Sequence, residues 1–198
     1  RNSNFDWFKL AKKTGSTQDY NITLNGGSDK IQSMFTMGYF KEEGAVKGYD
    51  LSRYSTRIKV IYKPYEWLSI KPNLSGSRTT DKDRQYSVGA MYSMLPWDNP
   101  YDENGNPVPN YYSGWVNSKA TNYLNDLAAG NYSSSCSYDL SGGFDFDVKI
   151  TPWLTFSSVN NYSYYNSQTH GYTDPKSSGG EGVDGRITEY NYNATRRY

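Results

Sequence analysis

The chain has 198 residues with 21 basic and 20 acidic side chains, and its net charge of +1 excludes the basic footprint of a nucleic-acid-binding domain. Aromatic residues make up 17% and include 21 tyrosines, yet the mean hydropathy is −0.87. A soluble core built from so few aliphatic residues would be thin, whereas a barrel with a polar lumen and a narrow apolar outer band needs fewer. No run approaches the roughly 20 consecutive apolar residues of a membrane helix, but spanning strands give a much weaker signal.

The first two predicted strands form a hairpin. Apolar and polar side chains alternate over 20–25, a Gly-Gly-Ser-Asp sequence supplies a tight turn at 26–29, and a second strand covers 31–40. A connection of about ten residues follows at 41–50, where two glycines interrupt the pattern.

The next two strands flank a short turn that contains Trp67. The strand over 51–63 has apolar residues on one face and basic residues on the other, and a fourth strand begins after the turn at 64–67. We expect the basic face to line a lumen, with the lumen-facing candidates Arg53, Arg57 and Lys59.

A fifth and a sixth strand flank a similar turn at 151–153 that contains Trp153. The strand over 138–150 alternates most regularly, with apolar residues at even positions and polar residues at odd positions. Its odd positions supply three further lumen-facing candidates: Asp139, Asp145 and Asp147. A last strand begins near Arg186 and still alternates where the chain stops, so we infer a piece of a longer protein.

Short turns and long loops alternate along the chain, as in outer-membrane barrels. The short turns are predicted to be periplasmic, and the long connections at 41–50, 81–137 and 166–185 are predicted to be extracellular loops. Trp67 and Trp153 then lie at one membrane interface, as an aromatic girdle requires. We therefore predict an all-β fold, a transmembrane antiparallel β-barrel. A soluble β-sandwich or Tyr-rich β-repeat protein is the alternative that alternation alone leaves open.

Two carboxylates on one face of the fifth strand, Asp145 and Asp147, have the residue type of a glycosidase acid/base pair. Such a pair needs a set separation and opposed pKa values, and a hydrated lumen wall explains the residues more simply. The sequence favours the wall, and no enzyme activity is expected.

Alternating oxygen ligands over 98–106 resemble a calcium loop, but the terminal Glu of that pattern is absent and Asn104-Gly105 is a strong turn signal. A turn is therefore predicted. Cys136 stands alone in the sequence, and His170 is expected in a loop, so neither indicates a zinc or nucleophile site. No metal or cofactor is expected.

Aromatic residues cluster in the longest predicted loop, where a short helix within 116–129 is also expected. Aromatic rings in such a loop stack on sugars, contact a partner protein or pack against one another, and the sequence leaves these options open. The candidates for substrate or partner contact are Trp97, Tyr101, Tyr111, Tyr112 and Trp115.

The sequence resembles the SusC/RagA family of TonB-linked outer-membrane transporters from Bacteroidetes. The resemblance runs through most of the chain in the family's order, and its segments are 6–15, 17–30, 37–44, 50–57, 63–76 and 99–108. The resemblance rests on these segments together.

The resemblance implies that residues 1–198 are part of one TonB-dependent receptor barrel domain. They would supply about seven strands of a barrel of about 22 strands, just after an N-terminal plug. Such strands with open edges need the remaining chain, because unpaired edge groups in hydrocarbon are costly. The resemblance further implies that the whole protein imports a nutrient. The implied partners are a SusD-like surface lipoprotein, the TonB complex, a glycan or peptide substrate and outer-membrane lipid. The alternative is a soluble or surface-displayed β-rich carbohydrate-binding module.

Overall fold

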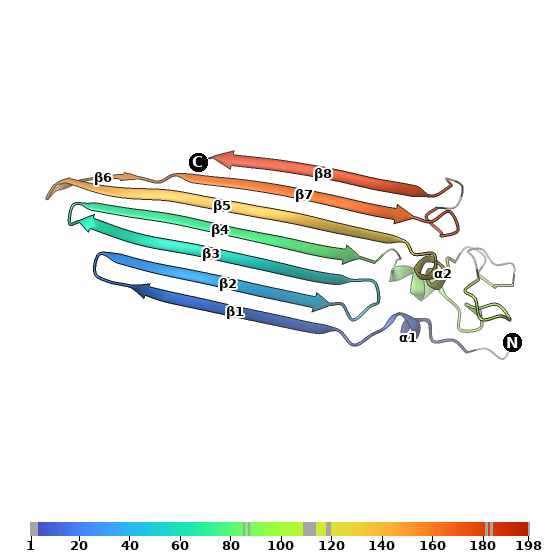
Figure 1. The fold of residues 1–198 in the computed structure, drawn as a ribbon. Helices are drawn as coiled ribbons and strands as arrows, with labels where there is room; N and C mark the ends of the chain where they lie inside the picture. The colour runs from blue at the N-terminus through green and yellow to red at the C-terminus, as the bar shows by residue number, and fades with distance from the viewer. Residues whose placement is uncertain are drawn as a thin grey trace.

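The computed structural model describes residues 4–84, 86, 88–108, 114–117, 120–180, 182 and 184–197. Their main feature is one long antiparallel sheet, which confirms the predicted all-β class (Figure 1). Its strands are β1 (Ser16–Gly27), β2 (Ile31–Glu43), β3 (Asp50–Tyr65), β4 (Leu68–Asp83), β5 (Tyr132–Thr151), β6 (Leu154–Ser158), β7 (Asn161–Thr173) and β8 (Arg186–Arg197).

Neighbouring strands in the sheet follow the chain in the order β1-β2-β3-β4-β5-β7-β8, with β6 also paired to β5. The pairs Phe146↔Ser158 and Gly143↔Asn161 belong to one continuous register, so β6 and β7 form a single strand with a local break. Seven consecutive strand positions therefore make up the sheet, as the sequence predicts. Both outer strands, β1 and β8, leave an edge open.

The short turns lie together at one end of the sheet and the long connections at the other (Figure 1). The strands continue further into the predicted loops than alternation indicated. The predicted loop over 41–50 is shortened because β2 reaches Glu43, and the loop over 81–137 is shortened because β4 reaches Asp83 and β5 begins at Tyr132. Likewise β7 extends to Thr173, so His170 lies in a strand and its expected place in a loop was wrong. Mainly polar side chains make up these extensions, which carry no regular apolar alternation but do pair through the backbone.

The two faces of the sheet differ in chemistry. Directly paired residues point to the same side, and one row of such pairs reads Tyr20, Tyr39, Tyr54, Arg78 and Tyr138 across β1 to β5. Between this row and the short turns, the same side carries Ile22, Leu24, Phe35, Ile58, Leu74, Leu140, Phe144 and Phe146. We call this side the apolar face and the opposite side the polar face.

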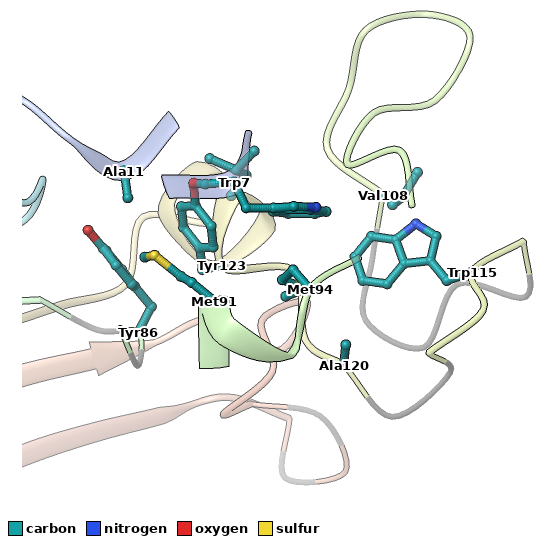
Figure 2. Close-up of a cluster of buried hydrophobic side chains, with 10 residues drawn as sticks. Trp7, Ala11, Tyr86, Met91, Met94, Val108, Trp115, Ala120 and Tyr123 are labelled. Atoms are coloured by element: carbon teal, nitrogen blue, oxygen red, sulfur yellow. The ribbon is translucent and has the colours of Figure 1, made fainter. Parts of the chain in front are cut away.

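The buried core lies at the loop end, outside the sheet. Helix α1 (Trp7–Ala11), the 3₁₀ helix η1 (Gly89–Ser93) and helix α2 (Tyr123–Ala128) come together there. Figure 2 shows their buried side chains converging. The core residues are Trp7, Ala11, Tyr86, Met91, Met94, Val108, Trp115, Ala120, Tyr123 and Leu124. We call this unit the loop module. The predicted helix within 116–129 is present but shorter, as α2.

Candidate functional site

The polar face carries all six charged residues that the sequence nominated. Strand register places Arg53, Arg57 and Lys59 of β3 opposite Thr79, Ser75 and Asn73 of β4. The same register places Asp139, Asp145 and Asp147 of β5 opposite Ser77, Lys71 and Ser69. The guanidinium of Arg53 lies 5.3 Å from the ring centre of Phe40, in a cation–π contact. This face therefore combines charged side chains with hydroxyl and amide groups.

Asp147 is the centre of a small network on this face. The Lys71 ammonium donates to its carboxylate at 2.6 Å, and the Ser157 hydroxyl donates at 2.8 Å. The neighbouring Asp145 accepts from the backbone N–H of Asn160 at 3.2 Å. Asp147 thus has donors from β4 and β6, and Asp145 has one from the residue between β6 and β7. These hydrogen bonds link neighbouring strands on the polar face.

In the loop module, buried polar groups organise the backbone. The Asn122 side chain is fully buried, and its Nδ2 donates to the carbonyls of Pro100 and Val108, each at 2.9 Å. Its Oδ1 accepts from the N–H of Leu124 and thereby caps α2. Asp98, 2% exposed, accepts from the N–H of Val116 at 3.0 Å. One buried amide and one buried carboxylate therefore fix segments distant in the sequence.

The β7–β8 connection is attached to the same module. Asp126 accepts hydrogen bonds from the N–H and the hydroxyl of Ser178. Asn125 Nδ2 donates to the carbonyl of Lys176 at 2.8 Å. Two connections of the sheet, β4–β5 and β7–β8, thus form one surface at this end.

The aromatic candidates have different environments. Trp115 is 6% exposed, stands edge-on to Trp7 at 5.6 Å between ring centres, and donates from Nε1 to the carbonyl of Asn99. It packs the loop against itself. Trp97 remains 43% exposed, and Tyr101 is half-buried where it bridges Pro107. Tyr111 and Tyr112 lie outside the described residues.

Sequence reasoning missed two aromatic roles in the module. Trp7 and Tyr123 belong to its core, although Trp7 precedes the first strand. Tyr92 is 78% exposed and stacks edge-on against Phe8 at 4.8 Å, so it presents a ring at the surface. The available signal was that Trp7 lies in a short segment with several apolar residues. Its ring partners, Trp115 and Tyr123, are more than a hundred residues away in the chain, so the sequence did not point to them.

The segment over 102–106 is a turn, as predicted. The Asp102 carboxylate accepts from the backbone N–H groups of Asn104 and Asn106 at 2.9 and 2.8 Å, and Gly105 adopts φ 81°. The hydrogen bond from the Asn106 backbone holds the pKa of Asp102 below its usual value. Among the described residues no cluster of three or more His, Cys, Asp or Glu has the arrangement of a metal site.

The two tryptophan turns stand side by side at the short-turn end. The carbonyl of Trp67 accepts from the N–H of Lys149, which joins the β3–β4 turn to β5. Trp67 stacks on Tyr65 at 5.3 Å with nearly parallel rings, and Trp153 is 82% exposed. Both indoles therefore lie at one end of the sheet.

Polar side chains replace apolar ones on the apolar face near the loop end of β7 and β8. Asn166 donates to Asn191 at 2.9 Å and also bonds Asn193, while His170 and Glu189 lie 3.5 Å apart. The apolar band therefore ends before the strands do. Within the described part of the chain, no helix is both long enough and apolar enough to span a bilayer.

Known proteins with the same pattern of strands are TonB-dependent receptors. The chain is 24% identical to SusC of Bacteroides thetaiotaomicron over 96% of its length and 21% identical to the receptor P26 of Formosa agariphila over 95%. It superposes on the RagAB peptide transporter with a TM-score of 0.78 over 99% of its length, at 25% identity. The chain resembles the SusC/RagA transporters in sequence and in fold.

This SusC/RagA-like segment spans about a fifth of its curated relatives, 21% of SusC and 19% of P26. It covers 23% of the matched RagAB chain, in both the RagAB transporter and the closed-closed state of the RagAB peptide importer. Its sheet has open edges at β1 and β8. No family model matches the chain.

Proposed function

We propose that the protein containing this segment imports a nutrient across the outer membrane as a TonB-dependent receptor. In this proposal residues 1–198 belong to one barrel domain whose apolar face contacts lipid and whose polar face lines the lumen. The observation that carries it is the apolar face, together with the similarity to SusC and RagAB.

The dimensions of the apolar face support this placement. Tyr54 and Tyr62 bound it on β3, and at about 3.4 Å per residue they are separated by about 27 Å along the strand. With a tilt of about 40°, this corresponds to about 21 Å across the membrane, close to the apolar band of outer-membrane barrels. The neighbouring rings of Tyr20, Tyr39 and Tyr54 form one aromatic border, and Trp67 and Trp153 belong to the other.

The placement puts the loop module and the connections over 44–49 and 174–185 outside the cell. We propose that the exposed rings of Tyr92 and Trp97 contact a SusD-like surface lipoprotein or the substrate. Their exposure supports this role, whereas the burial of Trp115 makes it a structural residue of the module. The TonB complex would act through other parts of the protein.

The proposed substrate is a peptide or an oligosaccharide. RagAB is a peptide importer, and the hydroxyl- and charge-rich polar face is compatible with either class. Growth of a strain without the full-length protein, on defined peptides and oligosaccharides, separates them. A growth defect on one class, reproduced in a TonB-deficient strain, supports import of that class.

The topology is tested by cysteine labelling in a Cys136→Ser background of the full-length protein. A membrane-impermeant maleimide should label Asn104→Cys, in the loop module, on intact cells. Glu66→Cys, in a short turn, should react only after the outer membrane is permeabilised. Labelling of Glu66→Cys on intact cells contradicts the proposed orientation.

The alternative function, a soluble or surface-displayed carbohydrate-binding module, leaves the apolar face exposed to water. Ile22, Leu24, Phe144 and Phe156 are each at least half exposed, and an apolar surface of this extent marks a lipid or protein contact. Recovery of the full-length protein in the membrane fraction, with heat-modifiable gel mobility, excludes this alternative.

A further inference from the structure

One cation lies in the aromatic row of the apolar face. Arg78 of β4 occupies the place between Tyr54 and Tyr138 at which the neighbouring strands carry tyrosines. Its side chain is exposed, and its guanidinium carbon lies 5.8 Å from the ring centre of Tyr138. The long side chain of an arginine at the border of an apolar band reaches the headgroup region, where anionic groups are available to pair with it.

A groove of about 580 Å³ begins at Arg78 and continues over the apolar face. Its lining residues include Tyr54, Thr56, Gly76, Leu140 and Tyr164. Gly76 contributes no side chain to the groove, and a Cβ added there would make only ordinary contacts at 3.6 Å or more, so a larger residue fits at this position. The groove has the apolar lining that an acyl chain requires.

Arg78 has hydrogen-bond donors to spare at the head of this groove. Its Nε donates to Cys136 Sγ at 3.5 Å, which turns the guanidinium towards β5. Within the described part of the chain the five ion pairs include none with Arg78. A guanidinium has five N–H donors in a planar fork, which matches phosphate oxygens in a bidentate arrangement.

We propose that Arg78 and the groove beneath it form a binding site for a phosphate-bearing membrane lipid, with the phosphate on the guanidinium and one acyl chain in the groove. The site rests on the outer-membrane placement proposed above. The guanidinium of Arg78 complements a phosphate, and the apolar groove below it complements an acyl chain. Because only a lipid carries both groups, the site favours a lipid over free phosphate. Tyr54 and Tyr138 would flank the headgroup at the interface.

The test uses the full-length protein in detergent micelles and counts bound lipid by native mass spectrometry. The probes are dioleoyl phosphatidate, dioleoylglycerol with the same chains but no phosphate, and inorganic phosphate. The variants are Arg78→Gln, which removes the charge, and Gly76→Leu, which fills the groove. Arg57→Gln on the polar face is the matched control for loss of one arginine.

Phosphatidate should bind the wild-type protein and the Arg57→Gln control equally. Arg78→Gln should lower phosphatidate occupancy about tenfold, since a charge-assisted hydrogen bond is lost, and should leave the weak binding of dioleoylglycerol unchanged. Gly76→Leu should lower the binding of both lipids. Inorganic phosphate should not compete with phosphatidate at equal concentration.

The proposal is overturned if phosphatidate occupancy is the same in Arg78→Gln and wild type, or if free phosphate displaces the lipid. Heat-modifiable mobility and surface labelling of each variant report insertion separately. A correctly inserted protein without lipid adducts therefore refutes the lipid site alone, whereas a protein that fails to insert refutes the proposed placement.

Discussion

The hydroxyl of Tyr123 donates a hydrogen bond of 2.7 Å to the backbone carbonyl of Trp7, a residue 116 positions earlier in the chain. The ring of Tyr123 also stands edge-on to the Trp7 indole. Because Trp7 precedes β1 and Tyr123 precedes β5, this contact joins the start of the sheet to its middle strands. The loop module therefore depends on both segments.

Loss of this hydroxyl should loosen the module. Tyr123→Phe removes one hydrogen bond in a buried site, which costs about 1 kcal/mol. Amide hydrogen exchange in α2 of the full-length protein should accelerate about fivefold. Tyr92→Phe is the control, because the Tyr92 ring is largely exposed. Equal exchange in Tyr123→Phe and wild type would show that the hydrogen bond contributes nothing.

Alkaline pH should weaken the module through the same residue. Burial raises the pKa of Tyr123, and burial also raises that of Tyr86. A raised pKa in the folded state means that the neutral form is favoured by folding. Keeping Tyr123 neutral therefore contributes fully to the stability of the module below the unfolded-state tyrosine pKa of about 10. This contribution is lost as the pH rises from that value through the higher pKa of the folded state. Tyrosinate absorbance of wild type minus Tyr123→Phe should give a midpoint above 10; a midpoint at or below 10 argues against burial.

Two tryptophans of one loop should respond differently to truncation. Trp115→Ala removes a buried indole and should destabilise the module by about 3–5 kcal/mol, so protease cleavage within 84–131 should increase strongly. Trp97→Ala removes a half-exposed indole and should increase cleavage much less. If Trp97 contacts the proposed SusD-like lipoprotein, Trp97→Ala should reduce the amount of lipoprotein that co-purifies with the full-length protein. Unchanged protease resistance of Trp115→Ala contradicts the observed core.

The β1–β2 turn provides a matched pair of glycines. Gly27 adopts φ 155°, and a Cβ there would lie 2.2 Å from the carbonyl oxygen of Ile31. A Cβ at Gly26 would meet nothing within 4 Å. Gly27→Ala should therefore destabilise the hairpin by more than about 1 kcal/mol, while Gly26→Ala should be neutral. The temperature at which heat-modifiable mobility is lost compares the two, and equal temperatures would contradict the turn geometry.

The sheet was largely predictable because alternation reports which side of a strand each residue faces. The regular alternation on β5 predicts that Asp139, Asp145 and Asp147 share one face, and the strand register places all three on the polar face. Strand ends were less predictable. Residues 132–137 and 166–173 are polar on both faces near the loops, so no period marks them, and only backbone pairing extends β5 and β7 there.

The loop module was not predictable from local patterns. Its core joins residues from α1, η1 and α2, and the Trp7–Tyr123 contact leaves no periodic signal in either segment. For the same reason the distinction between buried Trp115 and exposed Tyr92 required the fold. Arg78 was equally hidden, because its importance comes from the tyrosines that flank it on neighbouring strands.

The long separation between Trp7 and Tyr123 also determines the order in which this segment assembles. Closing a loop of more than a hundred residues is entropically slow unless intervening structure brings its ends together. The hairpins β1–β2 and β3–β4 supply that structure, because each turn is short and each strand pairs with its chain neighbour. We therefore expect the loop module to form last, and only after the strands have paired in the correct register. A slipped hairpin would leave the Trp7 indole without its partners and expose it to proteases at the surface.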